Sequence, residues 1–295
     1  MMTRPHQGAL RAAAAAALLY AATAHAVTVD AGDYTRLPDG TTLALLYYQH
    51  FEGSQLYASG NRVPGTAGLG ADVGILRGVR FVDVGDITVV PQFLLPFGRL
   101  DTHGILAGAR STNGVGDLIF APTVHLLQDP ERKRSFAFTP WIYMPTGAYD
   151  NKNALNALGE HRWKLDLQVA YVTPLSGKWT LDLIGDAVWY GRNGDFGGAG
   201  ATMKQAASYQ AQSHLRYHLG PSTYVAGMLS HERGGETMVD GVARDDRQRR
   251  TKALLSVAHF VSPSVQLLAS YGRDLSVRTG VKEDQRLNLR VLKVF

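Results

Sequence analysis

Hydrophobic and polar residues alternate with a period of two along most of the chain. From Lys164 to Tyr171, for example, the odd-numbered positions are apolar and the even-numbered ones are Lys, Asp, Gln and Ala. Successive side chains of a strand point to opposite faces, so this alternation predicts half-buried β-strands. Twelve such segments occur, near residues 42–51, 67–81, 87–97, 115–127, 136–145, 163–173, 179–190, 207–219, 222–232, 250–261, 264–276 and 284–295.

The connections between these segments alternate in length. Those after the even-numbered segments are short, whereas those after the odd-numbered segments are long and polar, as in residues 191–206 and 233–249. Short turns at one end and long loops at the other are typical of outer-membrane barrels, whose turns lie in the periplasm. We therefore predict an all-β fold: a closed antiparallel transmembrane β-barrel of about twelve strands, with short periplasmic turns and long extracellular loops.

Closure of the sheet makes a prediction about the C-terminus. A strand crosses hydrocarbon only if every backbone N–H and C=O group is paired, which requires a sheet without edges. The last segment should therefore pair with the first, near residues 43–50, and Phe295 should lie in the periplasmic aromatic girdle. A terminal strand that ends in Phe also resembles the signal read by the outer-membrane barrel assembly machinery, although Lys293 stands where an apolar residue is usual.

The N-terminus has the pattern of a secretory leader. Arg4 and Arg11 precede an apolar run of about a dozen residues, which is too short to span a bilayer. An A-x-A site follows at Ala24 to Ala26, so we predict a signal peptide at residues 1–26 and a mature barrel at residues 27–295. The chain has no Cys, which excludes disulfides, thiol chemistry and Cys-ligated zinc.

Composition narrows the class of partner. The 32 Gly, 13 Tyr and 4 Trp residues suit strands, tight turns and interfacial rings more than helices. A formal charge of +5 is modest in an exported chain, and it favours outer-membrane lipids over nucleic acid as a partner. We expect the bacterial outer membrane as the location.

The polar faces of the predicted strands should enclose the lumen. A twelve-strand barrel is wider than the eight-strand kind that side chains fill, and narrower than sixteen-strand porins, so it suits one small molecule at a time. Charges of both signs argue against a strict anion or cation pore, and the alternative is that these groups pair across the lumen and plug it. The predicted lumen-lining residues are Lys164, Asp166, Gln168, Asp182, Asp186, Gln210, Gln212, His214, Arg216 and His218.

Three short motifs resemble a known family. They are TNGVGDL at residues 112–118, PWIYMPTGAY at residues 140–149 and RWKL at residues 162–165. This order is similar to that of the MetA-pathway of phenol degradation family, the SphA-like outer-membrane transporters associated with the degradation of aromatic compounds. The resemblance implies passive uptake of small hydrophobic or aromatic solutes, and we expect no cofactor.

Catalytic sites find little support in the spacing of candidate residues. His214 and His218 share a strand face but lie roughly 13 Å apart at about 3.4 Å per residue, too far to share one metal ion. Ser256 and His259 point to opposite faces, and no common catalytic motif occurs. We therefore predict no enzyme and neither catalytic nor metal-binding residues. An outer-membrane lipid-modifying enzyme and a soluble exported β-protein remain the alternatives.

Two of the long loops have unusual compositions. Residues 191–200 are too rich in Gly for regular structure and are expected to form a mobile or inward-folding loop. Residues 244–250, with the sequence RDDRQRR, either contact lipid phosphates through arginine forks or form a solvated run of charges.

Overall fold

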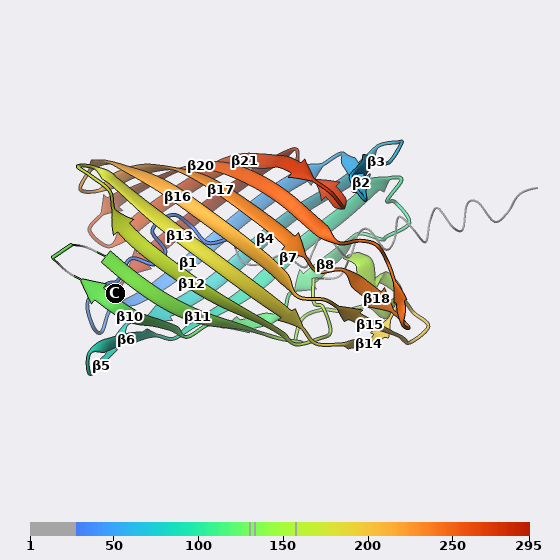
Figure 1. The fold of residues 1–295 in the computed structure, drawn as a ribbon, viewed down its shortest axis with the longest axis horizontal. Helices are drawn as coiled ribbons and strands as arrows, with labels where there is room; N and C mark the ends of the chain where they lie inside the picture. Colours follow the sequence, from blue (N-terminus) through green and yellow to red (C-terminus); the bar gives the residue numbers. More distant parts are fainter. Residues whose placement is uncertain (1–27, 130, 133, 157) are drawn as a thin grey trace, which may run out of the picture.

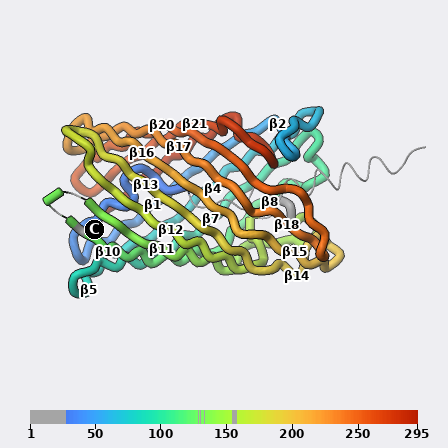
Figure 2. Tube along the Cα trace, viewed as in Figure 1, coloured from blue at the N-terminus to red at the C-terminus, as the bar shows by residue number. Residues whose placement is uncertain are grey.

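The computed structural model describes residues 28–129, 131–132, 134–156 and 158–295. The predicted signal peptide lies outside these residues. The described chain forms a barrel of tilted antiparallel strands (Figure 1). Figure 2 traces the chain once round this barrel, from the blue N-terminal strands to the red C-terminal ones.

Twelve wall strands form the ring within the described residues, which confirms the predicted all-β barrel. The ring closes between the first and last strands, which pair without interruption from Leu43 opposite Val294 to Glu52 opposite Gln285. Phe295 continues this pairing by donating its N–H to the carbonyl oxygen of Thr42. In order round the ring, the wall strands are β1 (Thr42–Gly53), β4 (Ala67–Arg80), β6 (Ile87–Val90) with β7 (Gln92–Gly104), β9 (Leu118–Phe120) with β10 (Thr123–Asp129), β11 (Arg134–Met144), β12 (Lys164–Pro174), β13 (Trp179–Tyr190), β16 (Ser208–Gly220), β17 (Thr223–Gly234), β20 (Gln248–Ser262), β21 (Val265–Val277) and β23 (Gln285–Val294).

The third and fourth wall strands are each interrupted at a proline. Pro91 separates β6 from β7, and Pro122 separates β9 from β10. Proline has no N–H to donate to the ladder, so strands tend to break or bulge there. The pairing in this part of the wall is consequently made in short pieces, including β8 (Thr112–Val115) against β7.

The apolar faces of the wall strands point outward. Leu255 is 74% exposed at the middle of β20, whereas Asp166 and Asp274, on the opposite parity of their strands, are fully buried. A soluble β-protein would bury the apolar parity instead, so this arrangement rules out that alternative. Among the described residues, no helix is long and apolar enough to cross a bilayer.

The prediction that residues 191–200 are too rich in Gly for regular structure is wrong. Residues 193–205 form a hairpin of β14 (Asn193–Phe196) and β15 (Ala201–Gln205), which continues into β18 (Thr237–Val239) and β19 (Val242–Ala243). Its turn contains Gly197, Gly198 and Gly200, all with positive φ, so the glycines supply the turn conformation instead of preventing regular structure. The remaining elements are β2 (Gln55–Ala58), β3 (Asn61–Arg62), β5 (Val82–Val84), β22 (Gly280–Lys282) and the short 3₁₀ helix η1 (Asn151–Asn156).

Candidate functional site

The barrel interior is crossed by residues 28–41, which precede the first strand and which we call the inserted segment. Its backbone is held by side chains from distant wall strands. The N–H of Gly32 donates to Asp182 at 2.9 Å, and the carbonyl oxygen of Ala31 accepts from the Tyr224 hydroxyl at 2.5 Å. Asp182 lies on β13 and Tyr224 on β17, so these contacts bind the segment to one side of the wall.

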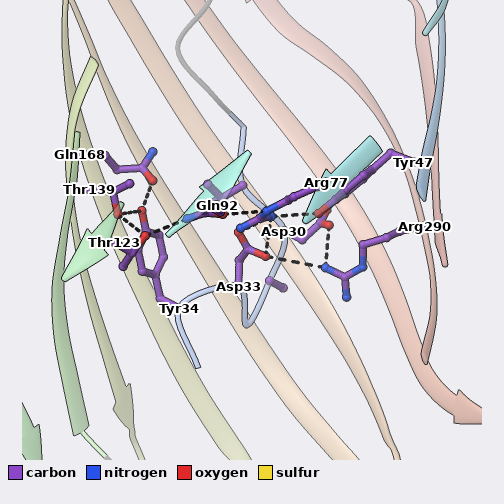
Figure 3. A network of polar contacts seen from close by, with 12 residues as sticks. Asp30, Asp33, Tyr34, Tyr47, Arg77, Gln92, Thr123, Thr139, Gln168 and Arg290 are labelled. Atoms are coloured by element: carbon purple, nitrogen blue, oxygen red, sulfur yellow. Dashed lines mark hydrogen bonds and ion pairs between the residues drawn. The ribbon is translucent and has the colours of Figure 1, made fainter. Parts of the chain in front are cut away.

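Two ion pairs fix the inserted segment to the β4 and β23 side of the barrel (Figure 3). Asp33 accepts from Nη1 of Arg77 at 3.0 Å, and Asp30 accepts from Nη1 of Arg290 at 2.9 Å. Arg77 also donates to the Tyr47 hydroxyl at 2.9 Å, so its guanidinium is shared between the segment and the wall. The charges of Asp30 and Asp33 are therefore balanced by arginines of the barrel wall.

Tyr34 fixes the same segment to the opposite side. Its hydroxyl lies 3.1 Å from Oγ1 of Thr139 and donates to Oε1 of Gln168. Burial raises the pKa of the Tyr34 phenol, so the group keeps its proton and can serve as a donor. Together with the two ion pairs, this contact holds the segment from both sides of the lumen.

The inserted segment separates two cavities. The periplasmic cavity, of about 560 Å³, is lined by residues near the short turns, including Leu37, Phe81 and Val294. The inner cavity, of about 310 Å³, lies on the extracellular side of the segment. Asp33 and Arg77 line both cavities, so this ion pair stands at the boundary between them.

The inner cavity has an apolar sector and a polar sector. Apart from Arg77, strands β4 to β11 supply an apolar sector, which is formed by Ile75, Leu94, Ile119, Trp141 and Tyr143. Strands β20, β21, β23 and β1 supply the polar sector, which is formed by Lys252, Ser270, Arg286, Asn288 and Gln49. Such a cavity can hold a ring against one wall and polar substituents against the other.

The residues of the first sequence motif organise the extracellular side of this cavity. The Asp117 carboxylate accepts the N–H groups of Gly147 and Glu160, both at 2.9 Å. Gly147 packs so closely on this motif that a Cβ there would lie 2.5 Å from the carbonyl carbon of Gly116. The motif residues thus tie the loop of residues 145–163 to the wall between β8 and β9.

This same loop folds into the lumen, where it carries a buried ionic cluster. Glu160 accepts from Arg162 at 2.6 Å and is also bonded by Nζ of Lys164. Burial alone raises the pKa of Glu160, but Lys164 and Arg162 outweigh it and lower the pKa to about 2. The sequence predicted a mobile or inward-folding loop at residues 191–200, whereas the residues that line the inner cavity from a long loop are Leu158 and Glu160.

The ten predicted lumen residues all lie on the interior parity of their strands, and all are buried except the half-buried His218. Their surroundings differ. Lys164, Arg216 and His218 border the cavities, whereas Gln168, Asp182, Gln212 and Arg216 bond to the inserted segment or to its partners. Asp186 and Gln210 accept hydrogen bonds in turn from Gln168 or Gln212. Together with Asp166 and His214 they are buried and line neither of the two cavities.

Sequence reasoning missed the residues that hold the inserted segment in the lumen. Asp30 and Asp33 lie in a stretch without strand periodicity, and their partners Arg77 and Arg290 were not among the candidates. The sequence did contain an indication of these ion pairs, because Arg77 and Arg290 occupy inward positions of otherwise apolar-rich strands. Unpaired arginines would be costly there, which points to carboxylates elsewhere in the chain.

The charged run at residues 244–250 was expected to be a surface feature, in contact with lipid phosphates or with water. The structure shows that it does not form one exposed surface. Arg250 is buried in the lumen, where it donates to Asp274 at 2.5 Å. Asp246 is also buried and accepts from the N–H of Thr237 at 2.7 Å. Arg247 is exposed and pairs with Glu236, so the run divides between the interior and the surface.

Comparisons with known proteins agree with this architecture. A model of the family described as "Putative MetA-pathway of phenol degradation" matches residues 53–291. The crystal structure of an outer-membrane channel from Pseudomonas putida F1 is 43% identical, with a TM-score of 0.88, over 91% of this chain and 100% of that one. A search of curated proteins finds no match.

More distant structures share the fold alone. The transport unit of the autotransporter AIDA-I from Escherichia coli is 9% identical, with a TM-score of 0.53 and complete coverage of both chains. The beta domain of the Bordetella autotransporter BrkA is 10% identical, with a TM-score of 0.53, over 88% of this chain and 100% of that one. Both are similar as barrels, and neither bears on the solute.

Proposed function

Because the chain belongs to the family described as "Putative MetA-pathway of phenol degradation", we propose that it passes small hydrophobic or aromatic solutes passively through its lumen. The protein is an outer-membrane β-barrel, similar along most of its length to an outer-membrane channel. The proposal concerns the solute and its route.

The inner cavity is the observation that carries this proposal. Its volume of about 310 Å³ lies at the lower end of the range for small-molecule sites, which is roughly 300 to 1,000 Å³. Ile75 and Tyr143 offer apolar surface to an aromatic solute beside Trp141, whose own side chain is 1% exposed. Lys252 and Asn288 can meet hydroxyl or carboxylate substituents. A sugar of similar size would leave the apolar sector in contact with its hydroxyl groups.

Passage from the inner cavity to the periplasmic cavity requires the inserted segment to move. The segment lies between the two cavities and is held by Asp30, Asp33 and Tyr34. A solute would enter past the loop of residues 145–163, rest in the inner cavity, and cross when the segment withdraws from its contacts. No energy source enters this scheme, so net flux follows the concentration gradient.

Catalysis is not part of the proposal. The matched family and the related Pseudomonas putida protein point to transport, and no observation favours a lipid-modifying enzyme. Within the part of the chain that the structure describes, no group of three or more metal-ligating side chains could hold a metal ion. We further expect recognition of the C-terminal strand by the barrel assembly machinery through Phe295, which is 71% exposed.

Liposome swelling with the refolded protein tests the proposed function. We expect faster swelling with 4-hydroxybenzoate or benzyl alcohol than with glucose, and none with raffinose. The matched variant is Trp141→Leu, which removes a ring from the apolar sector and should reduce the preference for aromatic solutes over glucose. Equal rates for aromatic solutes and glucose in the wild-type protein would contradict the proposal, as would hydrolysis of the liposome lipids.

A further inference from the structure

A basic surface lies on the outside of the barrel near its extracellular end. On β17, the outward residue Leu229 is followed by the exposed residues His231 and Arg233. On β20, Arg249 occupies the corresponding outward position at the extracellular end of the strand. We call His231, Arg233 and Arg249 the basic rim.

The strand register places two of these arginines directly opposite each other. Arg233 pairs with Arg249 across β17 and β20, one position beyond the inward pair of Glu232 and Arg250. Like charges on directly opposite residues of neighbouring strands destabilise the sheet. The chain therefore carries an electrostatic cost at this point of its outer surface.

No acid of the barrel offsets that cost within the described residues. Neither Arg233 nor Arg249 makes an ion pair there, and the neighbouring carboxylate of Glu232 is buried on the inward face. The outward arginine of β7 is different, because Arg99 lies 2.7 Å from Asp101 and 3.6 Å from Asp72. The described residues therefore leave the basic rim available to an anion from outside the chain.

Aromatic side chains locate this surface relative to the bilayer. Tyr209 on β16 lies directly opposite Arg233 and is 49% exposed, and Trp189 on the next strand is 45% exposed. Outward Tyr and Trp rings mark the interface between hydrocarbon and headgroups in membrane barrels. The basic rim is therefore at the depth of the headgroups of the outer leaflet.

Arg273 adds a further cation on the adjoining strand. It faces outward on β21, opposite Ala253, and two residues after the exposed Tyr271. This position lies deeper than Arg249, but a long arginine side chain can extend its charged end toward the interface. Arg273 can support an anion held by the basic rim without being its main ligand.

We propose that the basic rim is a binding site for the phosphate groups of lipid A, the membrane anchor of outer-leaflet lipopolysaccharide. Arginine presents a planar fork of donors that matches phosphate oxygens, and two arginines on opposite residues can grip one phosphate from both sides. Bound phosphate also removes the repulsion between Arg233 and Arg249. The site lies on the outer wall, so it is independent of solute passage through the lumen.

Native mass spectrometry of the refolded protein in detergent tests this site. The probes are bisphosphorylated lipid A, dephosphorylated lipid A and phosphatidylglycerol. We expect the wild-type protein to retain one lipid A molecule, and to bind the dephosphorylated form at least tenfold more weakly. The double variant Arg233→Gln, Arg249→Gln should lose at least tenfold in lipid A affinity, and Arg273→Gln should lose less.

Arg80→Gln is the matched control, because it removes an exposed arginine at the periplasmic end of β4. This control should bind lipid A as the wild-type protein does, and heat-modifiable gel mobility verifies that each variant is folded. Equal lipid A affinity in the double variant and the wild-type protein would overturn the proposal. Phosphatidylglycerol bound as tightly as lipid A would also overturn it, since the site would then not select lipid A.

Discussion

Asp33→Asn should loosen the inserted segment and increase the time for which the channel is open. The Asp33 carboxylate lies 3.0 Å from Arg77 and 3.9 Å from Arg290, so it faces two guanidinium groups. The side chains of Asp33 and Arg77 are only 11% and 9% exposed, and the pair is largely shielded from water. Because Asn has nearly the same shape, the substitution removes the charge and little else.

The size of the effect follows from the cost of an unpaired buried charge. Removing one partner of a buried ion pair costs about 3 to 5 kcal/mol. The lower value applies here, since Asn retains an acceptor and both cavities border the pair. At about 1.4 kcal/mol for each factor of ten, the equilibrium for withdrawal of the segment should shift by about a hundredfold. Asp30→Asn should act in the same direction but not additively, because Arg290 contacts both carboxylates.

Single-channel recording in planar bilayers measures this shift directly. The open probability of Asp33→Asn should exceed that of the wild-type protein, while the control Asp86→Asn, in an exposed periplasmic turn, should leave it unchanged. Equal open probabilities in all three proteins would refute the idea that the ion pairs hold the channel closed. A lower melting temperature without a change in conductance would assign Asp33 to the stability of the wall instead.

Three further predictions test the loop of residues 145–163 and the lipid-facing surface. Glu160→Gln should raise conductance near neutral pH. The substitution leaves Arg162 and Lys164 without their counter-ion, so the loop of residues 145–163 should be held less firmly in the lumen. In the wild-type protein the pKa of Glu160 is lowered from its ordinary 4.5 to about 2, so the ionised carboxylate stabilises the loop fully above pH 4.5. This stabilisation is lost as the pH falls from 4.5 toward about 2, and conductance should rise only over that interval. Gly147→Ala would bring a Cβ to 2.5 Å from Gly116 and 2.6 Å from the Asp117 nitrogen, so it should lower stability by about 1 to 3 kcal/mol, seen as a lower temperature for the heat-modified gel shift. Leu255→Arg, at the middle of β20, should cost about 2 to 4 kcal/mol in urea titrations of folding into liposomes, and an unchanged value would contradict lipid contact at this residue.

The wall of the barrel could be predicted from the sequence because the bilayer imposes a simple pattern on it. Every second residue of a wall strand meets lipid, so apolar positions such as Leu165, Leu167 and Val169 recur at a spacing of two. Closure follows from the absence of water in hydrocarbon, which predicted the pairing of β1 with β23. Alternation also placed the ten candidate residues on the interior face.

The contents of the lumen could not be predicted in the same way. Periodicity shows which side chains point inward, but it does not show what they meet there. The contact between Asp30 and Arg290 joins residues 260 positions apart, and the contact between Asp33 and Arg77 joins residues 44 positions apart. Nothing periodic marks the inserted segment, so its place among these arginines became visible only in three dimensions.

The difference between wall and lumen also indicates which part can move. Each wall strand is held by ladders of backbone hydrogen bonds, and opening one would leave several backbone groups unpaired in hydrocarbon. In residues 28–37, the backbone hydrogen bonds to other backbone groups that the structure describes are local, as from Asp33 to Asp30 and from Thr35 to Gly32. Side-chain contacts alone join this stretch to the wall, and water in the adjoining cavities can replace them one by one. We therefore expect displacement of the inserted segment to cost less than opening a wall strand, and we expect these residues and their arginine partners to determine opening.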